Sequence, residues 1–259
     1  MDPKTLDHVA FWLADREPIA ETLTSRFGMH VIDRQDNFTL VGADARRGKL
    51  TLFSAEGPRE QGAFKHVALR VSTLPAGVPG EIDLGQGVRL QLVETPTDSE
   101  YDLDHVALYS AEPAETAEAY ERFGFDPAPP SPAGHPRVEV GGAYVEFHPG
   151  EPGDPEKPLL NHLAVLVDSV DEHIAEAEDM GVVDNIVDAA NTRAVFVWGP
   201  DRVRIEYVEH KPEFALTKRL RVPVWPACAP RCERASSARR RSSTRREREP
   251  AARCCCRVA

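Results

Sequence analysis

The first 217 residues contain no cysteine. All five cysteines of the 259-residue chain fall in its last 42 residues, at Cys228, Cys232, Cys254, Cys255 and Cys256. The body of the chain therefore has no disulfide, no thiolate metal ligand and no cysteine nucleophile. Any metal that the body binds must be held by nitrogen and oxygen donors.

Long apolar runs are also absent, and none approaches the roughly 20 residues that cross a membrane. The N-terminus is acidic and mixed in character, unlike a secretory signal. A hydrophobic content of 41% and a charged content of 28% are typical of soluble globular proteins. We therefore expect a cytoplasmic protein with no membrane partner, long enough for one or two domains with a core.

Positive charge is scarce in the body and concentrated in the tail. Residues 218–259 carry 13 Lys and Arg against 3 Asp and Glu, whereas the rest of the chain carries 18 against 39. The tail is rich in Arg, Ser and Pro, a composition that predicts disorder. Basic tails bind polyanions without specificity. The abrupt change and the Cys-Cys-Cys run favour out-of-frame translation, so nucleic acid is not the expected partner.

One phrase, a histidine that opens a short apolar run, occurs four times. It begins at His8, His66, His105 and His162. The first two histidines are 58 residues apart and the last two 57, which makes two similar pairs. Arg26-Phe27-Gly28 recurs as Arg122-Phe123-Gly124, each time at the end of a helix-like stretch that glycine can terminate. These repeats predict four modules in two duplicated halves.

Apolar periodicity predicts the elements of each module. Helices are expected at residues 17–27, 114–123 and 170–180, but not in the second module, where residues 72–87 are rich in Gly and Pro. Five prolines within residues 127–136 predict an irregular loop, which we interpret as a candidate lid. Strands are expected at residues 8–13, 29–32, 38–41, 50–53, 64–71, 88–93, 105–109, 137–140, 143–147, 162–167, 182–187, 193–198 and 203–208.

With these repeats the sequence resembles the vicinal oxygen chelate superfamily, which includes glyoxalase I, bleomycin-resistance proteins and type I extradiol dioxygenases. The resemblance covers residues 5 to about 210. It implies an α+β fold of four βαβββ modules, the second one short, in two tandem halves. Each half would be an open cup of mixed strands with helices outside. The expected domains are residues 1–99, residues 100–217 and a disordered tail, 218–259.

Two glutamates lie in mid-strand between apolar neighbours, Glu146 in one predicted strand and Glu206 in another. A carboxylate in such a place is costly unless it is paired or bound to a metal. The resemblance implies that His105, His162 and Glu206 are metal ligands and that Glu146 occupies the fourth ligand position. Imidazole and carboxylate donors suit Fe(II), which we expect, and also Mn(II), Ni(II), Co(II), Zn(II) or Mg(II).

The corresponding positions of the first half hold His8, His66, Thr51 and Gln91. Neutral Thr51 and Gln91 stand where the second half has Glu146 and Glu206, so a divalent ion would lose both carboxylate charges there. We therefore interpret the first half as scaffold with a degenerate site, and expect the metal in residues 100–217.

Three functions remain open at this stage. Ring cleavage of a catechol-type substrate, chelated on Fe(II) through its vicinal oxygens, is favoured by the two-half architecture and the His-His-Glu set. Against it, Phe196 stands where the resemblance implies a tyrosine. His148 lies close to the position of the family's acid–base histidine, and we take it with Glu146 as a candidate catalytic residue. However, His148 follows its strand and does not open it.

The second possibility is a glyoxalase- or epimerase-type lyase or isomerase, in which all four ligands bind the metal and Glu146 or Glu206 moves the proton of an enediolate. The third is a metal-free ligand-binding protein of the resistance type. In each case the partner is a small molecule, and a homo-oligomer is compatible with the sequence. The substrate itself does not follow from these residues.

Overall fold

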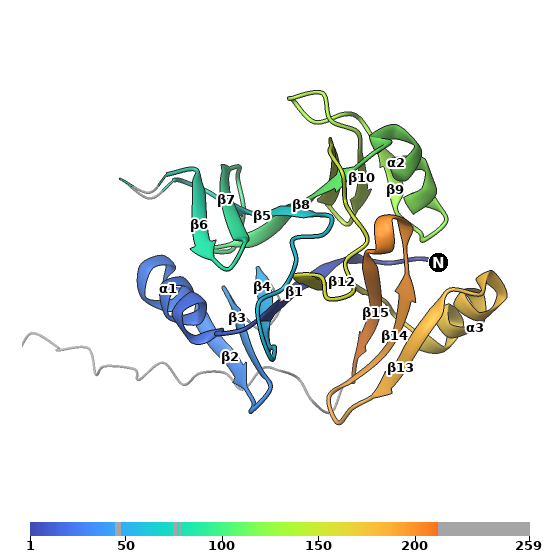
Figure 1. Ribbon diagram of the computed structural model, residues 1–259, viewed down its shortest axis with the longest axis horizontal. Coiled ribbons are helices and arrows are strands. Elements are labelled where there is room, and N and C mark those ends of the chain that lie inside the picture. The colour runs from blue at the N-terminus through green and yellow to red at the C-terminus, as the bar shows by residue number, and fades with distance from the viewer. Residues whose placement is uncertain (45–47, 75–76, 78, 212–259) are drawn as a thin grey trace, which may run out of the picture. The chain divides into compact units, whose positions relative to one another are not determined.

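The computed structural model describes residues 1–44, 48–74, 77 and 79–211, all within one compact unit, Met1–Lys218. Figure 1 shows long strands and few, short helices. The helices are α1 (Glu17–Phe27), α2 (Pro113–Glu121) and α3 (Val170–Met180), with one 3-10 turn, η1 (Pro200–Arg202). The strands are β1 (Thr5–Leu13), β2 (His30–Arg34), β3 (Phe38–Gly42), β4 (Lys49–Ser54), β5 (Phe64–Val71), β6 (Glu81–Gly85), β7 (Val88–Glu94), β8 (Asp102–Ser110), β9 (Asp126–Ala128), β10 (Arg137–Val140), β11 (Ala143–Pro149), β12 (Leu160–Leu166), β13 (Val183–Asp188), β14 (Thr192–Trp198) and β15 (Arg204–His210).

These strands form two mixed sheets. One has eight strands in the order β13-β14-β15-β12-β1-β4-β3-β2, and the other has seven in the order β6-β7-β5-β8-β11-β10-β9. In each sheet an antiparallel central pair, β1 with β12 or β5 with β8, is flanked by parallel neighbours. In Figure 1 the blue β1 lies beside the yellow β12. The first module is thus joined to the fourth, and the second to the third.

The predicted α+β class, with two mixed sheets and few helices, is confirmed. The strand pairing adds what the repeat could not decide. Each sheet takes one module from either half of the sequence, so the hydrogen-bonded ladders cross the predicted boundary at residues 99 and 100. That boundary follows the repeat in the sequence and does not follow the sheets. The predicted disordered tail, residues 218–259, lies outside the described residues.

The core follows from the alternation of side chains along each strand. In β1, Val9, Phe11 and Leu13 are at most 1% exposed. Phe11 also meets Phe64 of β5 edge-on, with ring centroids 5.0 Å apart. Burying side chains of this size stabilises the fold by roughly 1.5–3 kcal/mol each. The alternate residues of β1, beginning with His8, stand on the opposite face of the sheet, and this face carries the candidate site.

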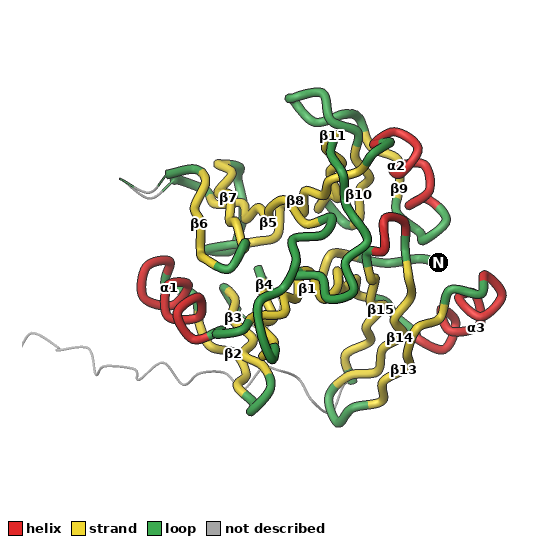
Figure 2. The backbone as a smooth tube through the Cα atoms, in the orientation of Figure 1, coloured by secondary structure: helices red, strands yellow, loops and turns green. Residues whose placement is uncertain are grey.

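The helices lie close to their predicted bounds, and α1 and α3 begin and end at the predicted residues. α1 ends at Gly28 (φ 70°) and α3 ends at Gly181 (φ 68°), both in the left-handed conformation that glycine adopts without steric cost. Figure 2 shows these helices in red beside the yellow strands. None of the helices described is long and apolar enough to cross a membrane.

Two strands were not predicted. In the second module no helix lies between β5 and β7 among the described residues, as expected, but β6 forms there and pairs with β7. The proline-rich stretch begins with β9, which contains Pro127 and pairs with β10. β9 is the last strand of its sheet. An edge strand tolerates proline because the missing N–H has no partner to lose.

Candidate metal centre

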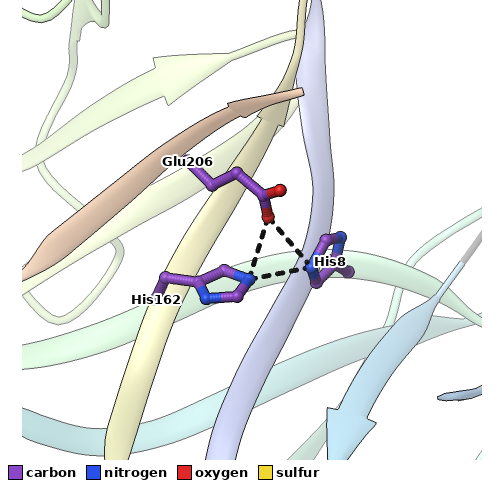
Figure 3. Close-up of side chains that lie close together, drawn as sticks. All are labelled: His8, His162 and Glu206. Atoms are coloured by element: carbon purple, nitrogen blue, oxygen red, sulfur yellow. Dashed lines mark hydrogen bonds and ion pairs between the residues drawn. The ribbon is translucent and has the colours of Figure 1, made fainter. Parts of the chain in front are cut away.

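Three side chains from three strands converge on the eight-stranded sheet (Figure 3): His8 of β1, His162 of β12 and Glu206 of β15. We call them the first triad. The Nε2 atoms of His8 and His162 are 2.9 Å apart. The Glu206 Oε2 atom is 2.9 Å from the His162 Nε2 and 3.3 Å from the His8 Nε2. The first triad thus unites the first module with the fourth.

The register of the strands explains this convergence. Ala164 of β12 lies between His8 on one neighbouring strand and Glu206 on the other. His162 precedes Ala164 by two residues and so shares its face of the sheet. Because the methyl group of Ala164 is short, the three longer side chains can meet above it. The alanine two residues after each repeated histidine is fully buried at Ala10, Ala68, Ala107 and Ala164.

The residue before each histidine of the first triad sets the orientation of the ring. The His8 Nδ1 is 2.8 Å from the Asp7 Oδ2, and the His162 Nδ1 is 2.9 Å from the Asn161 Oδ1. When Nδ1–H donates to these oxygens, the Nε2 lone pair is directed at the other two members. A second ring nitrogen held in this way is the usual support of a metal-bound histidine.

The donor atoms of the first triad fit a divalent ion. Two ligands bound at about 2.1 Å and at right angles lie roughly 3 Å apart, which is the spacing of all three pairs. The Glu206 Oε2 is buried, and although the two Nε2 atoms are 2.9 and 3.3 Å away, no well-directed hydrogen bond reaches it. An unsatisfied buried carboxylate oxygen is costly, and an ion bound by all three side chains would satisfy it. Imidazole and carboxylate donors suit Fe(II), Mn(II), Co(II), Ni(II) or Zn(II).

The electrostatics of the first triad favour a cation. Burial raises the pKa of Glu206, but the neighbouring His162 and His8 outweigh burial and hold this pKa well below its usual range. Burial lowers the pKa of His8, but the neighbouring carboxylates of Asp7 and Glu206 outweigh burial and raise this pKa to about 9. The pKa of His162 is lowered, chiefly by burial. Without metal, a proton on His8 therefore stands beside the Glu206 carboxylate, in the place of a cation.

A buried ion pair supports His8 from the side away from Glu206. The Lys49 Nζ lies 2.8 Å from both carboxylate oxygens of Asp7, and the His210 Nε2 lies 3.0 Å from Oδ1. Burial raises the pKa of Asp7, but Lys49, His210 and His8 together hold it well below its usual range. Asp7 therefore stays charged and can orient His8.

Aromatic rings lie against His162. The Phe196 ring is edge-on at 5.2 Å between centroids and the Phe53 ring at 6.2 Å. Phe53 also contacts Trp12 at 5.2 Å and Phe38 at 5.6 Å. Trp12, Phe38 and Phe53 are half-buried, so part of each side chain is accessible. This side of the first triad offers an apolar, aromatic surface to a ligand.

The four predicted ligands do not form one group. His162 and Glu206 belong to the first triad, whereas His105 and Glu146 lie on the seven-stranded sheet. The reason is the pairing of the modules, which places the third module beside the second and the fourth beside the first. His8 is the member that sequence reasoning assigned to scaffold. The sequence did offer a reason to include His8, because it is the first of the four repeated histidines.

On the seven-stranded sheet the other two repeated histidines meet. The Nε2 atoms of His66 and His105 are 2.9 Å apart, and the His105 Nδ1 is 2.7 Å from the Asp104 Oδ1. We call His66 and His105 the histidine pair. Burial and the neighbouring His105 lower the pKa of His66 to about 3. The pair repeats the arrangement of His8 and His162, as the duplicated sequence implies.

Glu146 lies with two other histidines. Its Oε1 is 2.8 Å from the His148 Nε2, and donor atoms of His135, Glu146 and His148 lie within 4.8 Å of one another. We call these three residues the second triad. His148 was predicted to be catalytic with Glu146, and the structure places both side by side on β11, on the other sheet from Glu206. Sequence reasoning did not single out His135, which lies in the proline-rich loop.

Comparison with known proteins gives structural likeness only. No family model matches the chain, and no curated protein matches its sequence. The structure is similar to that of a "putative dioxygenase" from Bacillus subtilis, with a TM-score of 0.62 and 13% identity over 82% of this chain and 86% of that one. It is similar to glyoxalase I from Zea mays, with a TM-score of 0.61 and 15% identity over 80% and 93% of the two chains.

A third similar structure is that of the cppA protein from Streptococcus pneumoniae, with a TM-score of 0.54 and 11% identity over 81% of this chain and all of that one. At such low identity these comparisons establish a shared fold. They leave the chemistry to be argued from the residues of this chain.

Proposed function

We propose that this chain, which has the vicinal oxygen chelate fold, is a divalent-metal-dependent enzyme whose metal is held by His8, His162 and Glu206. The finer proposal is ring cleavage of a catechol-type substrate bound through two vicinal oxygens, with Fe(II) as the metal. The observation that carries it is the convergence of two imidazoles and one carboxylate, each pair of donor atoms 2.9–3.3 Å apart.

The number of protein donors distinguishes this chemistry from the glyoxalase type. Thr51, on the neighbouring strand β4, is the neutral residue at the fourth ligand position of this pair of modules. Three protein donors would leave room on a six-coordinate ion for two substrate oxygens and one further small ligand. Two histidines and one carboxylate are the donor set of non-haem Fe(II) oxygenases, in which the metal brings the organic substrate and O₂ together.

The residues around the first triad suit a planar substrate. Phe53 and Phe196 contact the His162 ring, and Arg204 places its guanidinium 4.1 Å from the Phe196 ring centroid. Aromatic rings bind other rings by offset or edge-on contact, worth about 0.5–1.5 kcal/mol per pair beyond burial. Asp7 and Asn161 orient the two imidazoles, and the burial of Glu206, 7% exposed, limits the access of water.

The deciding experiment loads the full chain anaerobically with Fe(II), adds a panel of catechols and follows O₂ uptake together with the absorbance of a ring-fission product. We expect uptake that is lost in Glu206→Gln and in His8→Ala. Glu209→Gln, on the same strand and outside the triad, is the matched control and should retain activity. Because His8 lies outside residues 100–217, loss of uptake in His8→Ala would show that the active metal site is not built from those residues alone.

Two results would overturn the ring-cleavage proposal. If metal binds and O₂ uptake is absent, solvent deuterium exchange into an α-hydroxycarbonyl compound would establish the lyase or isomerase type, for which the likeness to maize glyoxalase I is the supporting observation. If no metal binds and ligands bind equally well to His162→Ala, the chain is a ligand-binding protein of the resistance type.

A further inference from the structure

We propose a second metal centre on the seven-stranded sheet, in which His135, Glu146 and His148 bind a zinc-type divalent ion. It is separate from the first triad and does not depend on the function proposed above. Two imidazoles and one carboxylate are a donor set that holds zinc with one position left open. Donor atoms of the three residues lie within 4.8 Å of one another.

Glu146 is diverted from the position that Glu206 occupies in the first triad. Ala107 lies between His66 and Glu146 on its neighbouring strands, just as Ala164 lies between His8 and Glu206. By register alone, Glu146 would join the histidine pair. Its Oε1 lies instead 2.8 Å from the Nε2 of His148, two residues further along the same face of β11.

The proline-rich loop holds His135 in reach of Glu146. The backbone N–H of Ser131 donates to the carbonyl of His135 at 2.9 Å, and the N–H of His135 donates to the Ser131 Oγ at 3.2 Å. The ring of His135 lies 3.8 Å from that of His148 between centroids. The loop that was predicted as a lid thus delivers a ligand to the sheet.

The His148 Nε2 supplies an independent observation. His148 and Glu146 are each 8% exposed, and this nitrogen is buried without a hydrogen-bond partner although the Glu146 Oε1 is close. Two polar atoms this close would form a hydrogen bond if they faced each other. Atoms that share an ion face a common point instead. An ion there would satisfy the unpartnered nitrogen, whose burial is otherwise costly.

Lys65 weakens this centre and so offers a test in which affinity rises. Its Nζ lies 3.1 Å from the His148 Nδ1. An ammonium that donates to Nδ1 favours the ring form whose Nε2 carries the hydrogen and cannot bind an ion. Lys65 precedes its histidine as Asp7, Asp104 and Asn161 precede theirs. Lys65→Gln removes the positive charge and should tighten metal binding about tenfold.

The experiment measures the stoichiometry of Zn²⁺ binding to the metal-free full chain by calorimetry, with Co²⁺ absorption as a second probe. All five cysteines are first alkylated, which leaves residues 1–217 untouched because that part has no cysteine. We expect two ions per chain. His148→Ala and Glu146→Gln should each remove one ion, and His162→Ala should remove the other. Lys65→Gln should keep two and tighten the one that His148→Ala removes.

The outcomes separate the two proposals. One ion that is lost in His162→Ala and kept in His148→Ala would overturn the second centre and leave the first intact. One ion that is lost in His148→Ala and kept in His162→Ala would support the second centre and overturn the first. Two ions, neither of them affected by His148→Ala, would also overturn the proposal. Circular dichroism of each variant distinguishes loss of a ligand from loss of the fold.

Discussion

The residue that precedes each repeated histidine decides what the histidine can do. Asp7, Asn161 and Asp104 each place an oxygen 2.7–2.9 Å from the Nδ1 of the next residue. Lys65, which precedes His66 in the second copy, instead directs its ammonium at His148. Three histidines therefore present Nε2 as an acceptor of a metal or proton. The difference lies in a single side chain at each copy, and the sequence shows it directly.

Asp7→Asn should destabilise the protein by about 3–5 kcal/mol, because it leaves the Lys49 ammonium buried without its carboxylate. Lys49 is 1% exposed, and its Nζ bonds both oxygens of Asp7. The measurement is urea unfolding near neutral pH. Arg34→Met, which breaks the exposed pair of Arg34 with Glu17, is the control and should cost less than about 1 kcal/mol. Equal losses in the two variants would contradict this prediction.

The stability difference between the wild type and Asp7→Asn should depend on pH in one direction. The folded-state pKa of Asp7 is held well below its usual value of 3.8 by Lys49, His210 and His8, against the effect of burial. The charged carboxylate therefore stabilises the folded state fully above about pH 4, and this contribution is lost as the pH falls through the lower folded-state pKa. Unfolding curves between pH 2 and pH 6 should converge at the acid end. A constant difference would exclude the ion pair as its cause.

At the scale of elements, the turn between β10 and β11 is fitted against the start of β1. Gly141 and Gly142 both have positive φ, 57° and 85°. A Cβ at Gly141 would overlap the carbonyl oxygen of Lys4 and crowd Thr5, whereas a Cβ at Gly142 would meet nothing within 4 Å. Gly141 thus allows the close approach of the two segments, whereas Gly142 only allows the conformation of the turn.

Gly141→Ala should therefore destabilise the protein more than Gly142→Ala does. Both variants pay about 1 kcal/mol for a left-handed alanine, and Gly141→Ala must in addition shift the backbone of Lys4. We expect a difference of roughly 1–3 kcal/mol between the two variants in thermal unfolding. Indistinguishable melting temperatures of the two variants would contradict this prediction, because they would mean that the backbone at Lys4 can move with no loss of stability.

At the scale of the whole molecule, each sheet is completed by strands from both halves of the sequence. Residues 1–99 alone would leave β1 without β12 and β5 without β8, the antiparallel pairs at the centre of each sheet. An unpaired central strand exposes its backbone donors and acceptors together with an apolar face. The two halves are therefore expected to fold only together.

Separate expression of residues 1–99 and 100–217 should give fragments without a cooperative unfolding transition, and co-expression should give a complex that unfolds in one step. The control is the unbroken chain 1–217, which should unfold cooperatively by itself. Calorimetry and size-exclusion chromatography make both comparisons. A cooperative transition in either isolated fragment would contradict this view of the fold.

Much of the fold is predictable from local patterns. The histidine phrases, the Arg-Phe-Gly helix ends and the apolar alternation predict the modules, the helices and most strands, because each depends on residues close in sequence. β6 and β9 were not predicted from the sequence. β6 follows a stretch rich in Gly and Pro, and β9 contains Pro127. Pairing with β7 and β10 makes these segments strands.

The sequence alone determined which residue types gather at the site: repeated histidines, mid-strand glutamates and the polar residues before each histidine. Only the tertiary structure decided which copies meet. Four similar modules can pair in more than one way, and local sequence does not distinguish the pairings. The antiparallel ladders of β1 with β12 and β5 with β8 place His8 with Glu206 and His105 with His66. The energy that selects one pairing comes from contacts between residues far apart in the chain, such as the backbone hydrogen bonds from Lys4 to Leu166 and from Trp12 to Leu159.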